Sequence, residues 1–111
     1  MLLTWLTAFT WTLAIELPIY ALAIGRCFAR WWSVVVVVLA INLVTHPMLW
    51  FVFPRITPRW LYVAVGEVTV TAIEAALVAL AIRRPGRAVA AAVAANLASF
   101  AAGPLLWALV G

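Results

Sequence analysis

Long apolar segments alternate with short arginine-bearing stretches along the whole chain. Each segment is long enough to cross about 30 Å of hydrocarbon at a helical rise of about 1.5 Å per residue. Val34–Val38 is a β-branched run, but in lipid a helix is favoured because it satisfies every backbone polar group within the segment. The predicted spans are residues 3–24, 33–53, 60–82 and 88–110. The pattern predicts an all-α integral membrane protein, a four-transmembrane-helix bundle forming one membrane domain over residues 1–111.

Composition strengthens this prediction. The chain is 69% hydrophobic and 9% charged, and a soluble domain of 111 residues has too little interior to bury so much apolar surface. Its net charge of +4 comes from arginines that lie in short clusters between the spans, a pattern typical of topology signals and not of nucleic-acid binding. Cys27 is the single cysteine, which excludes an internal disulfide. The lipid bilayer is therefore the expected environment, and no nucleic-acid partner is expected.

The arginines also predict an orientation. Pro54–Arg59 and Arg83–Arg87 are predicted turns, and the first turn of the chain follows Gly25. Arginine is more frequent in the 1–2 and 3–4 turns than in the 2–3 turn. The positive-inside rule then places both termini outside the cytoplasm of a multi-pass protein in the cell inner (plasma) membrane. The 1–2 turn contains Arg26 and Arg30, and the 3–4 turn contains Arg83, Arg84 and Arg87. The 2–3 turn contains Arg55 and Arg59.

A repeated pattern divides the chain into two halves. The segment AIELPIYALAI at 14–24 returns as AIEAALVALAI at 72–82, with identical first three and last four positions. The second and fourth spans share Asn-Leu, a hydroxyl residue and then Pro-x-Leu-Trp. We therefore predict two tandem helical hairpins, residues 1–54 and 60–111. Both would have the same orientation and be related by a pseudo-two-fold axis along the membrane normal.

All acidic residues and the single histidine fall inside predicted spans. A charged side chain at the bilayer centre costs roughly 2.5–3.5 kcal/mol on insertion scales, so such residues are candidates for function. At helical rise, two glutamates and two asparagines lie about 12–15 Å from the cytoplasmic end, and a second tier lies at about 20 Å. The predicted site consists of Glu16, Asn42, Glu74 and Asn96, the second tier His46 and Glu67, and the supporting residues Thr12, Tyr20, Thr45 and Ser99.

The two halves differ in ways that predict asymmetry of the site. Glu67 has no counterpart in the first half, where Phe9 occupies the equivalent position. His46 corresponds to Phe100, and Tyr20 corresponds to Val78. The first hairpin therefore keeps more polar chemistry than the second.

Three functions are compatible with these residues. Buried carboxyl groups without a basic partner could be protonated, share protons, bind a cation or contact water, which favours proton- or cation-coupled transport or binding. Four spans enclose little pathway, so a transporter of this size would be a homo-oligomer. Alternatively, the sole role of the glutamates and asparagines could be to join the helices through hydrogen bonds. The chain would then be a non-catalytic subunit bound to a membrane-protein partner.

An intramembrane enzyme, a hydrolase or transferase acting on a lipid-soluble substrate, is the remaining alternative. Glutamate and histidine can act as general base and acid, and a divalent metal could bind at His46 and Glu67. However, the sequence contains neither His-Glu-x-x-His nor Glu-x-x-His, and no serine or cysteine precedes a predicted base. A proton, and less directly a divalent metal, is the cofactor that these residues suggest.

Overall fold

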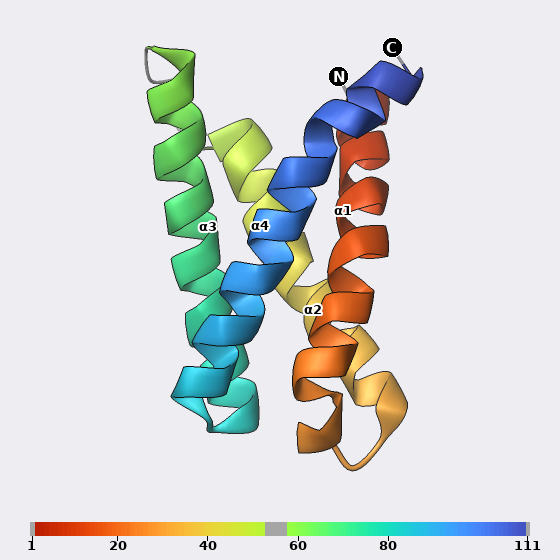
Figure 1. Cartoon of the computed structure of the whole chain (residues 1–111), viewed down its shortest axis with the longest axis vertical. Coiled ribbons are helices and arrows are strands. Elements are labelled where there is room, and N and C mark those ends of the chain that lie inside the picture. The colour runs from red at the N-terminus through yellow and green to blue at the C-terminus, as the bar shows by residue number, and fades with distance from the viewer. Residues whose placement is uncertain (1, 53–57, 111) are drawn as a thin grey trace.

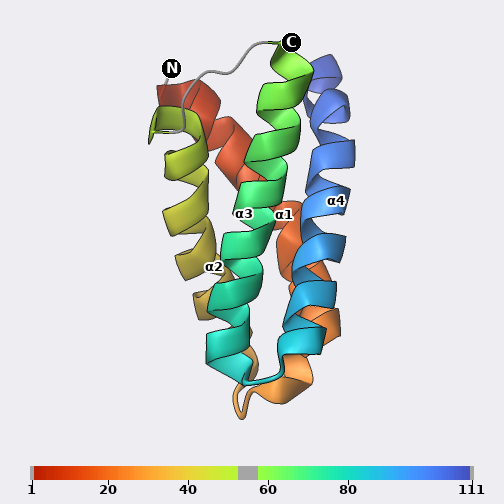
Figure 2. The ribbon, with the colours of Figure 1, turned by 90° about the vertical axis from the view of Figure 1, so that its left-hand side faces the viewer.

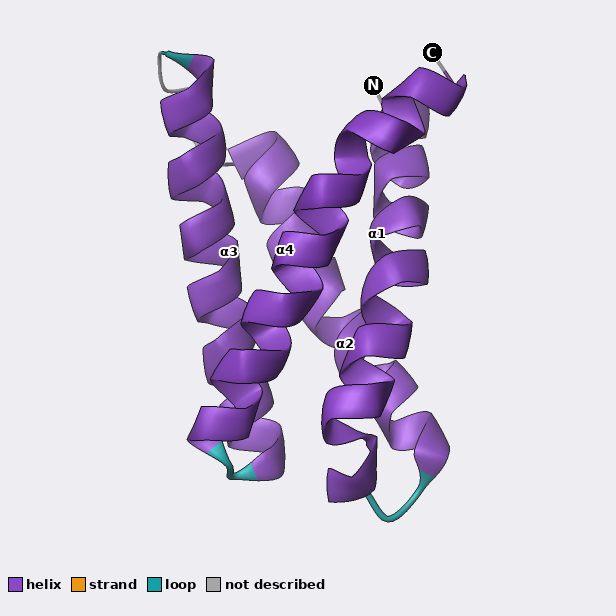
Figure 3. Cartoon of the chain, viewed as in Figure 1, coloured by secondary structure: helices purple, strands orange, loops and turns teal. Residues whose placement is uncertain are grey.

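The computed structural model describes residues 2–52 and 58–110, and this part of the chain is almost entirely helical, without a strand (Figure 3). The four long helices are α1 (Leu2–Ile24), α2 (Trp31–Pro47), α3 (Arg59–Ile82) and α4 (Pro85–Val110). All four helical segments are long and apolar enough to span a membrane, α2 together with the helical turns that follow it. The predicted four-span, all-α architecture is confirmed.

The helices form a bundle in which each contacts two neighbours. α4 packs along α3 and α1, and α2 packs along α1 and α3. The α1–α2 and α3–α4 connections lie at one end of the bundle, and the start of α1 and the end of α4 lie at the other (Figures 1 and 2). Five arginines are therefore gathered at the first end, on or beside the two connections. The predicted turn at 54–59 lies mostly outside the described residues, as does Arg55.

The two connections are built differently. After α1, a short 3-10 turn (Gly25–Cys27) leads into extended backbone at Phe28 and Arg30. After α3, Arg83 adopts the left-handed conformation, with φ 57°, and its N–H donates to the Ala79 carbonyl at 2.7 Å. This is a common way to end a helix, because it satisfies a carbonyl of the last turn.

The fourth helix begins three residues before the predicted span, whose start was placed at about residue 88. α4 begins at Pro85, so the turn predicted over Arg83–Arg87 shrinks to its first two residues. Proline is well suited to the first position of a helix, because its missing N–H would have no partner there and its φ is already helical. Ala88 N–H then donates to the Arg84 carbonyl at 2.9 Å.

The three prolines inside predicted spans have different effects. α1 continues through Pro18, and α4 continues through Pro104. After Pro47 the helix widens into a π-helical turn, Met48–Val52 (η2). A proline leaves carbonyls of the preceding turn without their helical partner, and a π turn is one way in which a helix accommodates such a fault.

Side chains are distributed as expected for a protein in lipid. Leu22 and Leu80, at 89% and 77% exposure, point outward, whereas Tyr20 and Val78 are fully buried. Small residues of α4 let the other helices approach closely, which is how membrane helices commonly pack. The buried apolar core lies toward the arginine-rich end and comprises Tyr20, Ile24, Val34, Val38, Ile41, Val78, Ala88, Ala91 and Ala95.

The contact between α3 and the turn after α2 yields a stability prediction. A Cβ placed on the buried Gly66 would lie 2.7 Å from Leu49 Cδ1. We expect Gly66→Val to lower the free energy of unfolding in detergent by about 1–3 kcal/mol, because overpacking forces neighbours to shift. Gly103→Val is the matched control, since nothing lies within 4 Å of a Cβ there. Equal destabilisation of both variants would contradict the prediction.

Candidate functional site

A small cavity of about 70 Å³, here called the central cavity, lies between the helices at mid-depth of the bundle. All six residues of the two predicted tiers line it, together with two of the four supporting residues. The lining is Thr12, Glu16, Asn42, His46, Leu49, Glu67, Val70, Glu74, Asn96, Ser99 and Phe100. The polar positions of all four spans thus converge on one site within a single chain.

Glu16 of α1 is held by two neighbouring helices. Its side chain is only 1% exposed. Ser99 Oγ of α4 donates to Glu16 Oε2 at 2.9 Å, and Asn42 Nδ2 of α2 donates to Glu16 Oε1 at 3.5 Å. Ser99 Oγ also lies 3.2 Å from the Asn96 carbonyl oxygen, so its single proton is shared between that carbonyl and Glu16, and Asn42 Nδ2 donates to the Val38 carbonyl at 2.9 Å. These second contacts orient the two donors that face the carboxyl group.

Glu74 of α3 is surrounded in the same way and is also 1% exposed. Tyr20 donates its phenolic O–H to Glu74 Oε1 at 2.9 Å. Thr45 Oγ1 lies 3.3 Å from Glu74 Oε2 and 3.0 Å from the Ile41 carbonyl oxygen, and its single proton is shared between these two acceptors. The Asn96 side chain also lies near Glu74 in the lining of the central cavity, and its Nδ2 donates to the Ala92 carbonyl at 2.9 Å. Tyr20 and Thr45 do not line the central cavity. Instead, they support Glu74 from the side of the buried core.

The Glu16 and Glu74 carboxyl groups both line the central cavity and interact electrostatically with each other. An ionised carboxylate can only accept a hydrogen bond, so two neighbouring carboxyl groups can hydrogen-bond to each other only when one of them carries a proton. The lining of the central cavity contains no arginine or lysine that could neutralise a second negative charge. The pair is therefore arranged to hold a proton between two acidic side chains from different hairpins.

The second tier lies beside this pair. His46 Nε2 is 3.1 Å from Thr12 Oγ1, and the Phe9 ring meets the imidazole edge-on at 5.5 Å between centroids. A hydroxyl beside an imidazole can serve as nucleophile and base, but here His46 Nδ1 has no partner to orient the ring. Asn42 Oδ1 is also buried without a partner. Buried polar atoms normally bind a protein group or water, and both residues line the central cavity, which has room for water.

Glu67 is the least enclosed of the three glutamates. It lines the central cavity and interacts electrostatically with Glu74, two helical turns away on α3. Over the described residues, no three His, Cys, Asp or Glu side chains are grouped so that they could hold a metal ion. The metal site suggested at His46 and Glu67 thus gains no support from the arrangement of these side chains.

Phe100 is one of three lining residues that the sequence did not identify as part of the site. It was noted only as the counterpart of His46, yet the fourth residue after Asn96 lies on the same helical face as Asn96. That spacing is the signal that could have identified it. Leu49 and Val70 complete the lining and were also not predicted.

No family model, curated protein or solved structure matches the chain. Its class is therefore defined by its own fold and site. The four apolar helices indicate a multi-pass membrane protein, and the candidate site is a pair of buried carboxyl groups enclosed by hydrogen-bond donors.

Proposed function

We propose that this protein is a small transporter or ion-binding protein in which the Glu16–Glu74 pair binds a proton or a small cation. The observation that carries the proposal is that two buried, electrostatically interacting carboxyl groups share a cavity whose lining contains no arginine or lysine. A hydrogen bond that only joined two helices would need just one carboxyl group and a neutral partner. A second carboxyl group at the same point adds repulsion unless a proton or a cation is bound there.

The size of the central cavity supports an inorganic ligand. A volume of about 70 Å³ has room for a few water molecules or a small cation. Sites for organic ligands in proteins typically have volumes of about 300–1,000 Å³. The carboxyl oxygens and the unpartnered Asn42 Oδ1 supply hard oxygen atoms, which suit a proton, a hydronium ion or an alkali cation.

The hydrogen-bond pattern supports duplication of the hairpin. Each glutamate lies near the asparagine of its own hairpin, Asn42 for Glu16 and Asn96 for Glu74. Each also accepts from a hydroxyl of the other hairpin. Those crossed donors are Ser99 to Glu16 and Thr45 to Glu74. We infer two repeats related by a pseudo-two-fold axis along the membrane normal, with the two carboxyl groups meeting near that axis.

The same proposal includes the assembly and the membrane. Four helices packed around so small a cavity enclose no continuous path for an ion, so we propose that a homo-oligomer forms the pathway. The arginine-rich end of the bundle faces the cytoplasm under the positive-inside rule, which leaves both termini outside it in the inner (plasma) membrane.

Labelling with a lipid-soluble carbodiimide tests the proposed site. The reagent attacks the protonated carboxylic acid, so we expect modification at Glu16 or Glu74 that decreases as the pH is raised. Mass spectrometry identifies the labelled residue. Glu16→Gln and Glu74→Gln each remove a labelling site, and Glu67→Gln is the matched control that keeps the central pair. If neither central glutamate reacts at any pH in a folded, monodisperse sample, the proposal fails.

A further inference from the structure

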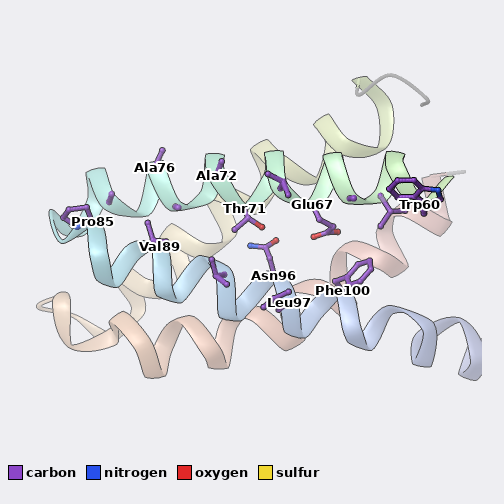
Figure 4. A pocket seen from close by; sticks show the side chains of 16 residues that line it. Trp60, Glu67, Thr71, Ala72, Ala76, Pro85, Val89, Asn96, Leu97 and Phe100 are labelled. Atoms are coloured by element: carbon purple, nitrogen blue, oxygen red, sulfur yellow. The ribbon is translucent and has the colours of Figure 1, made fainter. Parts of the chain in front are cut away.

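A second and much larger hollow lies on the outer face of the bundle between α3 and α4. We call it the α3–α4 groove; its volume is about 1130 Å³ (Figure 4). Along α3 it extends from Trp60 to Ala79, a distance of about 28 Å at helical rise, which is close to the thickness of the hydrocarbon core. The groove is open along the side of the protein and is therefore accessible from the bilayer.

Small side chains create the groove. Ala72, Ala76 and Ala79 line its α3 side over the half nearest the connecting turn. They leave space that larger residues would have filled against Val89 and Val93 of α4. In a bilayer this space is occupied by an apolar molecule, because a surface lined by alanine offers water no hydrogen-bond partner.

The groove and the central cavity share three lining residues, which are Glu67, Asn96 and Phe100. Figure 4 shows Glu67 and Asn96 projecting toward each other from α3 and α4, with Phe100 beside them. Asn96 is 5% exposed, whereas Phe100 is 51% exposed. These three side chains therefore border both the groove and the cavity that contains the Glu16–Glu74 pair.

The groove lining can carry negative charge but no positive charge. Glu67 is the only ionisable residue in its lining, and neither arginine nor lysine contributes to it. Its other polar side chains, Thr71 and Asn96, are neutral. A carboxyl group at the side of an apolar groove attracts a cation with apolar substituents and repels an anion of the same shape.

We propose that the α3–α4 groove is the binding site and lateral entrance for a hydrophobic monocation that enters from the bilayer. The apolar body of the ligand lies along the alanines of α3, and its cationic centre lies beside Glu67. Phe100 and Asn96 form the gate through which the cation acts on the Glu16–Glu74 pair. This inference rests on the proposed function, because binding of the cation would be exchanged against the proton or small cation held by that pair.

Two probes of the same shape and opposite charge test the charge preference. Purified protein in detergent is titrated with tetraphenylphosphonium and with tetraphenylborate, and binding is followed by tryptophan fluorescence, since Trp60 lines the groove. We expect the cation to bind at least about tenfold more tightly than the anion, and Glu67→Gln to weaken cation binding by about tenfold. Thr69→Val is the matched control, because it removes a hydroxyl group of α3 that does not line the groove and should leave the affinity unchanged.

The gate is tested by the rate at which the lipid-soluble carbodiimide modifies Glu16 and Glu74. We expect Phe100→Ala to accelerate this modification severalfold, and tetraphenylphosphonium to slow it. Leu97→Ala is the matched control, because Leu97 lines the groove at 62% exposure but does not reach the central cavity. Equal rates in the two variants would overturn the gate.

The outcomes separate this inference from the proposed function. Equal binding of the two probes, or no effect of Glu67→Gln, overturns the groove proposal while pH-dependent labelling of the central pair still stands. Absence of that labelling defeats the proposed function whatever the probes do. A second copy is the competing occupant. Cross-linking between copies through Ala72→Cys, in a Cys27→Ser background, that tetraphenylphosphonium does not reduce would assign the groove to an interface and overturn the proposal.

Discussion

Proteoliposomes that contain the Glu16→Gln/Glu74→Gln double variant are expected to lose proton–cation exchange. The assay imposes a gradient of Na⁺ or K⁺ and follows the luminal pH with a dye. A unit charge about 4 Å from a carboxylate gains on the order of 4 kcal/mol at an effective dielectric constant of about 20. Removing both carboxyl groups also removes the only groups of the pair that can carry the proton. We therefore expect exchange to fall by roughly a hundredfold or more.

The single variants separate the two carboxyl groups. In Glu16→Gln the amide can still hydrogen-bond to Glu74, so the fold should be preserved while the pair loses its second negative charge. We expect each single variant to abolish exchange but to keep one carboxyl group that carbodiimide can label. Glu67→Gln makes the same chemical change outside the pair and should retain Na⁺- or K⁺-driven exchange. Exchange at the wild-type rate in the double variant would refute the proposed mechanism.

Truncating Tyr20 is expected to cause the largest loss of stability. The Tyr20 side chain is fully buried, packs in the core with Ile24, Val38 and Val78, and donates to Glu74 at 2.9 Å. Tyr20→Ala leaves a cavity and also removes a donor from a buried carboxyl group. Large-to-small changes of aromatic core residues typically cost about 3–5 kcal/mol. We expect a loss of this size, measured by unfolding in mixed micelles of a mild detergent and dodecyl sulfate.

Two further variants divide this effect into its parts. Tyr20→Phe retains the ring and removes only the hydrogen bond, so we expect a loss of about 1–3 kcal/mol, the cost of leaving a buried polar group unpaired. Leu22→Ala, two residues away on α1, is the control for a change on the outer surface, because Leu22 is 89% exposed. A free energy of unfolding for Tyr20→Ala close to that of Leu22→Ala would contradict the prediction.

The location of the site could be predicted because lipid restricts where polar groups can lie. A carboxyl group, an amide and an imidazole within apolar spans must turn inward, and helical spacing places Asn42 and His46 on one face. The residues that share the central cavity therefore follow from periodicity and depth. The helix boundaries could be predicted less accurately. α4 starts at Pro85 because proline is favourable in the first turn of a helix, whereas the arginines around it had suggested a turn.

The partners within the site could not be predicted in the same way. Depth alone placed Glu16 near Asn42, but it did not indicate that Ser99 of α4 would make the shorter contact, at 2.9 Å against 3.5 Å. Tyr20 was predicted as a supporting residue that faces the interior, but the sequence did not indicate that it would donate to Glu74 of α3 from the side of the buried core. Such choices depend on the separation and rotation of each helix pair, which are set by the sizes of all the side chains between them.

The sequence by itself therefore determined four membrane-spanning segments and the polar residues that must be enclosed by them, because the cost of exposing charge and backbone to hydrocarbon depends only on local sequence. The tertiary structure alone decided that Glu16 and Glu74 share one cavity, that hydroxyl groups of one hairpin contact the glutamate of the other, and that Glu67 lines both this cavity and the α3–α4 groove. These features arise between helices that are distant along the chain. Their geometry results from the packing of the whole bundle, which is the sum of many small contacts. No single segment of the sequence is therefore sufficient to determine it.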